Sequence, residues 1–554
     1  MDLLGKAPLQ RRNIEVAYPP AMKAGSWKIT VLAALATYLV LAGMLAYTKR
    51  PWADEAWFAN ISVNILENGK TGISVLDPLG NANLLGRSLP GINEEYYLWI
   101  PVQEALYSLW YRMIGFSLLT MRAASICWGL VALGAWLVIV GRLTRNREVA
   151  SLALCFIATD FAFLDASADG RMDIMCAALS FSAIACYLGW RERHFGFAVL
   201  SSQILVVASG LTHPMGAVGF VALLFLIVYL DGRRIRWSHA ALAFLAYLVG
   251  VAVAGAYILP NMPMFRAQFS GALTGRLGAT ESIGGTLLRE ITAKYRDLYL
   301  PPSAHGVSAL RVLVPLIYAA GLAVVGLTPR LRGNVRYRQL LFLALVALVA
   351  ISVLDSGKLY YYMVHSTPYL AAMTAVWAYE WWRQGNLLRV VGGSFVTALV
   401  VLQVGWVGVV IRKDSYHRSF LPMAAFVNGW TQKQGGKQVL IMTSAELAFV
   451  IGFSRTISDD ALLGYQSRRQ PDLIVFDQRS YQSHLDGFER RRPDIAHYIR
   501  RLLAEQYVSV FTDGYYKVYE RVSPISAGTP SQAAPPNRPL AYLSEVNRQG
   551  LSSC

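Results

Sequence analysis

Long apolar segments constrain this chain more than any other feature of its 554 residues. Runs close to 20 residues, enough helix to cross about 30 Å of hydrocarbon, recur between residues 29 and 411. Hydrophobic residues make up 55% of the chain, and this share excludes an ordinary soluble protein. The sequence therefore predicts a polytopic α-helical membrane protein.

About eleven membrane spans are predicted. They lie near residues 29–48, 119–141, 148–164, 172–190, 195–212, 215–230, 239–259, 309–328, 339–354, 359–379 and 390–411. The first span follows several basic residues and is too long for a signal-peptide core. It is therefore predicted to be an uncleaved anchor with its amino end in the cytoplasm.

The distribution of arginine supports this number of spans. With eleven spans, the cytoplasmic loops hold fourteen arginines, whereas the short outer loops hold only Arg171 and Lys358. Counting the amphipathic stretch near 101–114 as a further span would invert this asymmetry. Glu104 and Arg112 within that stretch favour a helix lying on the membrane surface. The net charge of +17 is thus a topology signal, and no nucleic-acid partner is expected.

Composition divides the chain into four regions. They are a cytoplasmic N-terminal segment (1–28), a transmembrane region (29–411) with a long first outer loop (49–118), an extracytoplasmic α/β domain (412–522) and a Pro- and Ser-rich tail predicted to be disordered (523–554). In the α/β domain, β-rich runs near 438–442, 473–476, 508–511 and 516–519 alternate with helical stretches near 445–451 and 495–505. The five cysteines have neither metal-site nor disulfide spacing.

An Asp-Glu pair opens the first outer loop. The apolar spacing that follows predicts an amphipathic helix from about 52 to 67, closed by Gly69, with Asp54 on its apolar stripe. Acids in a first turn commonly do no more than complement the helix dipole. Asp54 is also a candidate general base, because its carboxylate is directed toward protein or lipid. Glu55 points about 100° away and suits a supporting or metal-contacting role.

A second acidic group enters the fourth predicted span. Asp173 lies one turn inside the apolar segment, where a lone charge costs about 2.5 to 3.5 kcal/mol, so a partner such as Arg171 is expected. Asp165 and Asp169 precede it on the same outer boundary. A structural ion pair and a part in the site are both compatible with this pattern.

Two cations on the outer side are candidates for binding a phosphate. Lys358 stands beside Tyr361 and Tyr362 at an interface, which suits a lipid phosphate but also a snorkelling lysine. His213 lies between two spans, where it can donate to an anion or cap a helix end.

Acids and cations that face one outer compartment suit one kind of chemistry in particular. A carboxylate can remove the proton of an acceptor hydroxyl, while cations hold the phosphate that leaves a lipid-linked donor. Five of the acids could also supply oxygen ligands to a divalent metal, and metal dependence stays open; they are Asp54, Glu55, Asp165, Asp169 and Asp173.

The order of these motifs resembles the GT-C glycosyltransferases, in particular the protein O-mannosyltransferase and bacterial aminoarabinose (lipid A) transferase branch. The resemblance covers about residues 29 to 520. It rests on Trp52-Ala-Asp-Glu55, Gly115-Phe-Ser-Leu-Leu-Thr-Met-Arg122, Arg171-Met-Asp173, Lys358-Leu-Tyr-Tyr-Tyr362, Pro368 and the outer α/β domain.

The resemblance implies that a sugar moves from a polyprenyl phosphate, such as undecaprenyl phosphate, to an acceptor hydroxyl with inversion at the anomeric carbon. The acceptor would be a glycan, glycolipid or protein at the outer face of the bacterial cytoplasmic membrane. Asp54 matches the acid assigned as base or acceptor-orienting residue, Asp173 the second essential acid, and Lys358 a cation near the lipid phosphate. Tyr361, Tyr362 and Asp169 are expected to contact substrate. The sugar and the oligomeric state stay open.

One departure bears on the phosphate. The aminoarabinose transferases carry Lys-Pro at the start of the second surface helix, whereas this chain has Trp99-Ile-Pro101. The phosphate is then expected to be bound by Lys358, His213, Arg171 or Arg87.

The alternative function is a transporter or flippase of a lipid-linked or anionic substrate. Transporters often show internal repeats, and no repeat is evident in this sequence.

Overall fold

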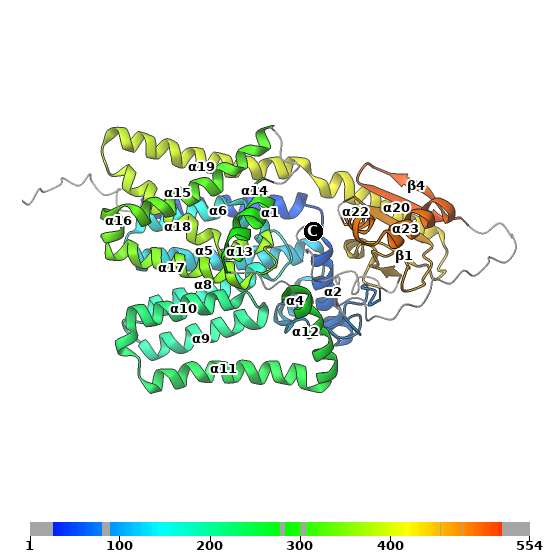
Figure 1. Cartoon of the computed structure of the whole chain (residues 1–554), viewed down its shortest axis with the longest axis horizontal. Coiled ribbons are helices and arrows are strands. Elements are labelled where there is room, and N and C mark those ends of the chain that lie inside the picture. Colours follow the sequence, from blue (N-terminus) through cyan, green and yellow to red (C-terminus); the bar gives the residue numbers. More distant parts are fainter. Residues whose placement is uncertain are drawn as a thin grey trace, which may run out of the picture.

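A computed structural model of the chain describes residues 26–79, 89–277, 283–300, 306–454, 456–478 and 480–522. Its long helices lie side by side, and a small sheet lies beyond one end of them (Figure 1). Helices α2 and α4 of the first outer loop lie at the same end. The arrangement agrees with the predicted fold class, a multi-pass helical membrane protein with an added α/β domain.

Nine helices in the described part are long and apolar enough to cross a membrane, and each coincides with a predicted span. The labelled helices that form these nine spans are α1 (Ser26–Thr48), α5 (Leu118–Thr144), α8 (Asp173–Trp190), α9 (Phe195–Thr212), α10 (Gly216–Asp231), α11 (Trp237–Ile258), α15 (Leu313–Leu327), α17 (Val335–Leu354) and α19 (Asn386–Lys413).

The two other predicted spans are interrupted. Helices α6 (Arg147–Thr159) and α7 (Phe161–Ser167) meet at an angle of 64°. Asp160 causes the break, because its backbone is extended and its carboxylate caps α7 by accepting from the Phe163 N–H at 3.0 Å. Near 359–379, a 3₁₀ helix η5 (Tyr360–His365) precedes α18 (Thr367–Trp382), which has 16 residues. The 3₁₀ helix η5 contains Tyr361 and Tyr362, and α7 packs against it.

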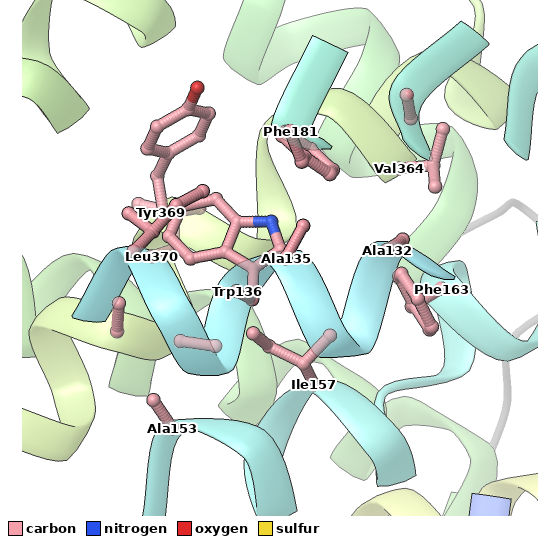
Figure 2. Packing of buried hydrophobic residues seen from close by; sticks show 14 of the residues in the cluster. Ala132, Ala135, Trp136, Ala153, Ile157, Phe163, Phe181, Val364, Tyr369 and Leu370 are labelled. Carbon is pink, nitrogen blue, oxygen red and sulfur yellow. The ribbon is translucent and has the colours of Figure 1, made fainter. Parts of the chain in front are cut away.

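A buried apolar cluster holds the spans together. Trp136 of α5 lies at its centre, with its ring perpendicular to that of Tyr369 of α18 at 4.7 Å between centroids (Figure 2). Phe181 of α8 contacts the same indole at 5.2 Å. Because α5, α8 and η5–α18 are packed in this way, these elements are fixed relative to one another.

The first outer loop begins with α2 (Ala53–Asn68), close to the predicted bounds. Gly69 ends the helix in the left-handed region at φ +66°, which glycine adopts without strain. Helix α4 (Val102–Ile114) lies between Pro101 and Gly115 and packs against α2, and it is not among the candidate spans. The predicted helix is therefore present, and its place on the membrane surface stays a prediction.

The α/β domain contains a five-stranded sheet in the order β2-β1-β3-β5-β4. Its strands are β1 (Ile441–Met442), β2 (Ile457–Ser458), β3 (Leu473–Asp477), β4 (Tyr507–Thr512) and β5 (Tyr516–Arg521). The first three are parallel, whereas β5 is antiparallel to both β3 and β4. The four predicted strands are present, and the fifth, β2, has only two residues.

Shorter elements complete the described chain. They are η1 (Gly232–Arg234), η2 (Leu259–Asn261), α12 (Met262–Leu277), α13 (Ile283–Arg289), the π-helix η3 (Glu290–Tyr295), α14 (Arg296–Tyr299), η4 (Gly306–Val312), α16 (Pro329–Gly333), η6 (Tyr416–Phe420), α20 (Leu421–Lys433), η7 (Ala445–Leu447), α21 (Ala448–Ile451), α22 (Tyr481–Arg491) and α23 (Pro493–Gln506).

Candidate functional site

Arg171 lies at the centre of the candidate site, in the short loop between α7 and α8. Its Nε donates to Asp173 Oδ2 at 2.8 Å, and its Nη1 donates to Asp54 Oδ2. One guanidinium thus joins two acids that the sequence placed in the site. The side chains of Arg171 and Asp173 are 6% and 2% exposed, whereas that of Asp54 is 24% exposed. Asp54 is therefore the acid of this triad that an incoming group can reach.

Aromatic rings surround the Arg171 guanidinium. Its central carbon lies 3.9 Å from the centroid of the Tyr361 ring and 5.0 Å from that of Trp52. Trp52 and Tyr361 also contact each other edge to face at 5.9 Å. Such cation–π contacts gain strength where water is excluded. Tyr361, predicted to contact substrate, therefore borders the same acids and cation.

Glu55 points away from Arg171 and is fully buried. Arg122 of α5 binds it through two parallel bonds, Nε to Oε1 at 2.8 Å and Nη2 to Oε2 at 2.7 Å. The N–H groups of Gly170 and Trp52 donate to the same carboxylate at 2.9 and 3.0 Å. Burial opposes ionisation, but Arg122 and Lys49 hold the pKa of Glu55 below its ordinary value. Glu55 therefore has the geometry of a supporting acid.

Lys49 joins a second pair of acids beside Glu55. Its Nζ lies 2.8 Å from Asp165 Oδ1 and 3.3 Å from Asp169 Oδ2. Burial and the nearby charge of Glu55 raise the pKa of Asp169. Asp169 Oδ1 has no hydrogen-bond partner among the described residues. This predicted substrate contact is thus a buried acid that retains its proton readily.

His213 follows α9 and faces aromatic rings. Its Nδ1 accepts from the Met215 N–H at 3.2 Å, and its Nε2 lies 3.4 Å from the Tyr362 hydroxyl. Trp99, just before helix α4, packs edge to face on the imidazole at 5.5 Å. His213 and Tyr362, predicted for different roles, are therefore neighbours.

Lys358 lies in a buried ring of four charges. Its Nζ contacts Glu290 Oε2 at 3.0 Å and also donates to the Ser352 carbonyl oxygen. Lys294 contacts both Glu290 Oε1 and Asp355 Oδ2 at 3.0 Å. Lys358 itself has a left-handed backbone at φ +54°, and its N–H donates to Asp355 Oδ1 at 2.9 Å. The predicted phosphate ligand is therefore bound to an acid in this structure.

Arg87, another predicted phosphate ligand, lies outside the described residues. Among the described residues, no group of three or more His, Cys, Asp or Glu side chains is placed to hold a metal. The acids near α2 are instead bound by lysine or arginine side chains, so they do not form a metal-ligand set.

Sequence reasoning assigned no role to four charged residues that the structure places in ion pairs with candidate site residues or with the partners of those residues. Arg122 lies in the first turns of a span, and the cost of a charge there was a usable signal for a buried partner. Lys49 directly follows the anchor. Glu290 and Lys294 have the i, i+4 spacing of a helical ion pair. The identity of each partner depends on the fold and could not be inferred from spacing.

The bundle of spans, the first outer loop with its surface helix and the α/β domain after the last span define a fold of the GT-C type. ArnT from Cupriavidus metallidurans shares this fold. Its crystal structure bound to undecaprenyl phosphate matches with a TM-score of 0.54 and 16% identity, over 92% of this chain and all of that one. The apo state of the same protein gives the same TM-score over 90% of this chain.

Archaeal oligosaccharyltransferase AglB from Archaeoglobus fulgidus, solved with an inhibitory peptide and a dolichol-phosphate, is also similar. It matches with a TM-score of 0.50 and 11% identity, over 90% of this chain and 75% of that one. No protein-family model and no curated protein sequence matches the chain. The similarity to the solved structures therefore establishes the fold.

Proposed function

We propose that this protein is an integral-membrane glycosyltransferase that moves a hexosyl or pentosyl group from a polyprenyl phosphate to an acceptor hydroxyl. One observation supports this most directly: Arg171 joins Asp54 and Asp173, acids from two separate segments, at the outer end of the bundle. Two proteins with the same fold were solved with undecaprenyl phosphate and with a dolichol-phosphate. A glycan, a lipid or a protein can supply the hydroxyl.

In the proposed reaction, Asp54 is the general base. The acceptor oxygen attacks the anomeric carbon from the side opposite the phosphate and forms the new glycosidic bond. The bond from carbon to phosphate oxygen breaks, and its electron pair leaves with the phosphate. The acceptor's proton passes to Asp54, and the anomeric configuration inverts.

Asp173 acts through Arg171 in this scheme. Asp173 accepts from Nε of the Arg171 guanidinium and is almost fully buried. It therefore fixes the guanidinium in an orientation in which Nη1 faces Asp54. An anionic phosphate competes with Asp54 for the same guanidinium. Donor binding then frees Asp54 to accept a proton and gives Arg171 a phosphate to neutralise.

Other phosphate contacts are assigned to Lys358, His213 and Arg87. Lys358 becomes available when the phosphate displaces Glu290, which is its acidic partner in the free protein. His213 lies beside Tyr362, and Tyr361 lines Arg171, so both tyrosines are placed to border the donor. No metal enters this scheme, because the described acids do not converge on one point.

The proposal further places the site on the outer side of a bacterial cytoplasmic membrane, together with the α/β domain. The fourteen arginines of the opposite loops support this orientation.

Mass spectrometry of envelope glycans and glycoproteins tests the proposal even while the acceptor is unidentified. Cells lacking the protein should lose one glycan mass, and the wild-type gene should restore it. Asp54→Asn and Asp173→Asn should not restore it, although both variants reach the membrane at normal levels. Asp297→Asn is the matched control, because Asp297 forms an exposed surface pair with Arg296.

Full restoration of the glycan by Asp54→Asn would exclude Asp54 as the general base. An unchanged glycan profile in cells lacking the protein, together with movement of a polyprenyl-phosphate sugar across proteoliposome membranes, would favour the flippase alternative.

A further inference from the structure

The carboxyl ends of the parallel strands β1, β2 and β3 carry several buried acids. In open α/β sheets this edge is where ligands commonly bind. Here most of the acids complete turns of their own domain. Asp460 accepts from the N–H groups of Leu462 and Gly464 at 2.9 and 3.0 Å, and Asp477 accepts from the Ser480 N–H at 2.6 Å. These side chains therefore stabilise the domain.

Asp459 differs, because it contacts the first outer loop through both its side chain and its backbone. Its Oδ2 accepts from Trp57 Nε1 at 3.0 Å. Its N–H donates to the Val75 carbonyl at 2.7 Å, and its own carbonyl accepts from the Asp77 N–H at 3.2 Å. The loop thus pairs with the chain directly after β2, at the outer edge of the sheet.

Trp57 connects this contact to the candidate site. It lies three residues after Asp54 on α2, within the same helix. The apolar face of α2 packs in one cluster with the domain, where Phe58 and Ile61 belong with Ala445 and Leu447. A helix held at Trp57 by the domain and at Asp54 by Arg171 has little freedom to rotate or slide.

We infer that Asp459 is a positioning residue for Asp54, and that the α/β domain serves the reaction by fixing α2 through the Asp459–Trp57 hydrogen bond. The inference rests on the proposed function for Asp54. It gives the domain a role in orienting the base, distinct from binding a ligand at its strand edge. A displacement of about 1 Å in a reacting group can lower a rate about 100-fold, so a modest shift of α2 has a large effect.

Trp57→Phe tests the inference with little disturbance, because it keeps a large ring and removes only the N–H donor. The restored envelope glycan, normalised to folded protein in the membrane, should fall roughly tenfold or more. Binding of undecaprenyl phosphate to the purified full chain in nanodiscs, followed by native mass spectrometry, should change less than about twofold. A merely structural defect would instead lower the amount of folded protein and leave the normalised glycan unchanged.

Further variants of Asp459 sharpen this test. Asp459→Asn keeps a carbonyl oxygen that can accept from Trp57 and should retain more product than Asp459→Ala. The double variant Trp57→Phe/Asp459→Ala should be no worse than Asp459→Ala alone, because Asp459→Ala has already removed the hydrogen bond from Trp57. Tyr481→Phe is the matched control, since its hydroxyl reaches Asp459 Oδ1 at 3.5 Å within the domain. It should leave product formation unchanged.

Hydrogen exchange separates failure of this inference from failure of the proposed function. In Trp57→Phe, exchange should quicken in α2 and stay unchanged in α23 of the α/β domain, whatever reaction the protein catalyses. Unchanged exchange in α2, or full product from Trp57→Phe where Asp54→Asn gives none, would overturn the positioning role. Full product from Asp54→Asn would instead overturn the proposed function, and the role of Asp459 in that reaction would fall with it.

Discussion

Replacement of Glu55 by glutamine should destabilise the protein strongly, although the two side chains have nearly the same size. Glu55 receives two charge-assisted hydrogen bonds from Arg122, at 2.8 and 2.7 Å, and two more from the backbone N–H groups of Gly170 and Trp52. Charge-assisted bonds are worth about 1.5 to 3 kcal/mol each. Glutamine has one acceptor oxygen in place of two, so one Arg122 bond is lost and the other loses the carboxylate charge, which predicts a cost of roughly 2 to 5 kcal/mol.

A second estimate agrees with the first. Removing one partner of a buried ion pair costs about 3 to 5 kcal/mol, because the other charge stays buried without compensation. The glutamine amide group would also point an N–H donor at donors of Arg122 or the backbone. Native proteins have only about 5 to 15 kcal/mol of net stability. Glu55→Gln should therefore melt well below the wild type.

Thermal unfolding of the purified full chain in a single detergent measures this effect, with folded protein quantified by size-exclusion chromatography after heating. Asp54→Asn is the control, because Asp54 is partly exposed and bonds to an Arg171 that retains Asp173. It should lose its product while melting much closer to the wild type than Glu55→Gln does, because the Arg171 guanidinium keeps its ion pair with Asp173. The reasoning fails if Glu55→Gln melts with the wild type, or if Asp54→Asn melts as low as Glu55→Gln.

Four further substitutions have expected outcomes. Burial raises the pKa of Glu104 from 4.5 to about 8, so the folded chain holds this proton more tightly than the unfolded chain. Stability should therefore fall as pH rises from about 4.5 to 8, and Glu104→Gln should reduce that fall in melting scans across this range. Lys358→Met should weaken undecaprenyl phosphate binding about tenfold or more in native mass spectrometry, whereas Glu290→Gln should strengthen it by releasing Lys358. Arg171→Lys should lose most of the envelope glycan, because an ammonium group cannot reproduce the planar fork that joins two carboxylates.

The fold was predictable because its signals are local. Apolar runs indicated the spans, and helical spacing with Gly69 indicated α2. The pairing of Asp173 with Arg171 also followed locally, since a charge inside a span needs a partner close by. The breaks in two spans were not predicted, because the periodicity continues through Asp160 and only the packed structure turns its carboxylate into a cap.

Ion-pair partners that are distant in sequence could not be predicted, for a different reason. Arg122 and Glu55 are 67 positions apart, and Lys358 and Glu290 are 68 apart. No spacing rule links such residues, because their meeting depends on how several helices cross. The sequence therefore ranked Asp54 and Glu55 only by their directions on a helix. The structure distinguishes them by environment. Asp54 is partly exposed and shares Arg171 with Asp173, whereas Glu55 is fully buried in a bidentate ion pair with Arg122.

The charges around α2 do not balance, and the imbalance bears on how a donor would bind. The acids are Asp54, Glu55, Asp165, Asp169 and Asp173, and the cations facing them are Lys49, Arg122 and Arg171. Burial and the charge of Glu55 raise the pKa of Asp169, and even with Asp169 neutral four negative charges face three positive ones. A lipid-linked phosphodiester would add a negative charge, and the phosphate monoester that leaves would add another. Positive charge must then come from outside this group. Lys358 can supply it only by exchanging Glu290 for the phosphate, so donor affinity should depend on how tightly Glu290 is held by Lys294.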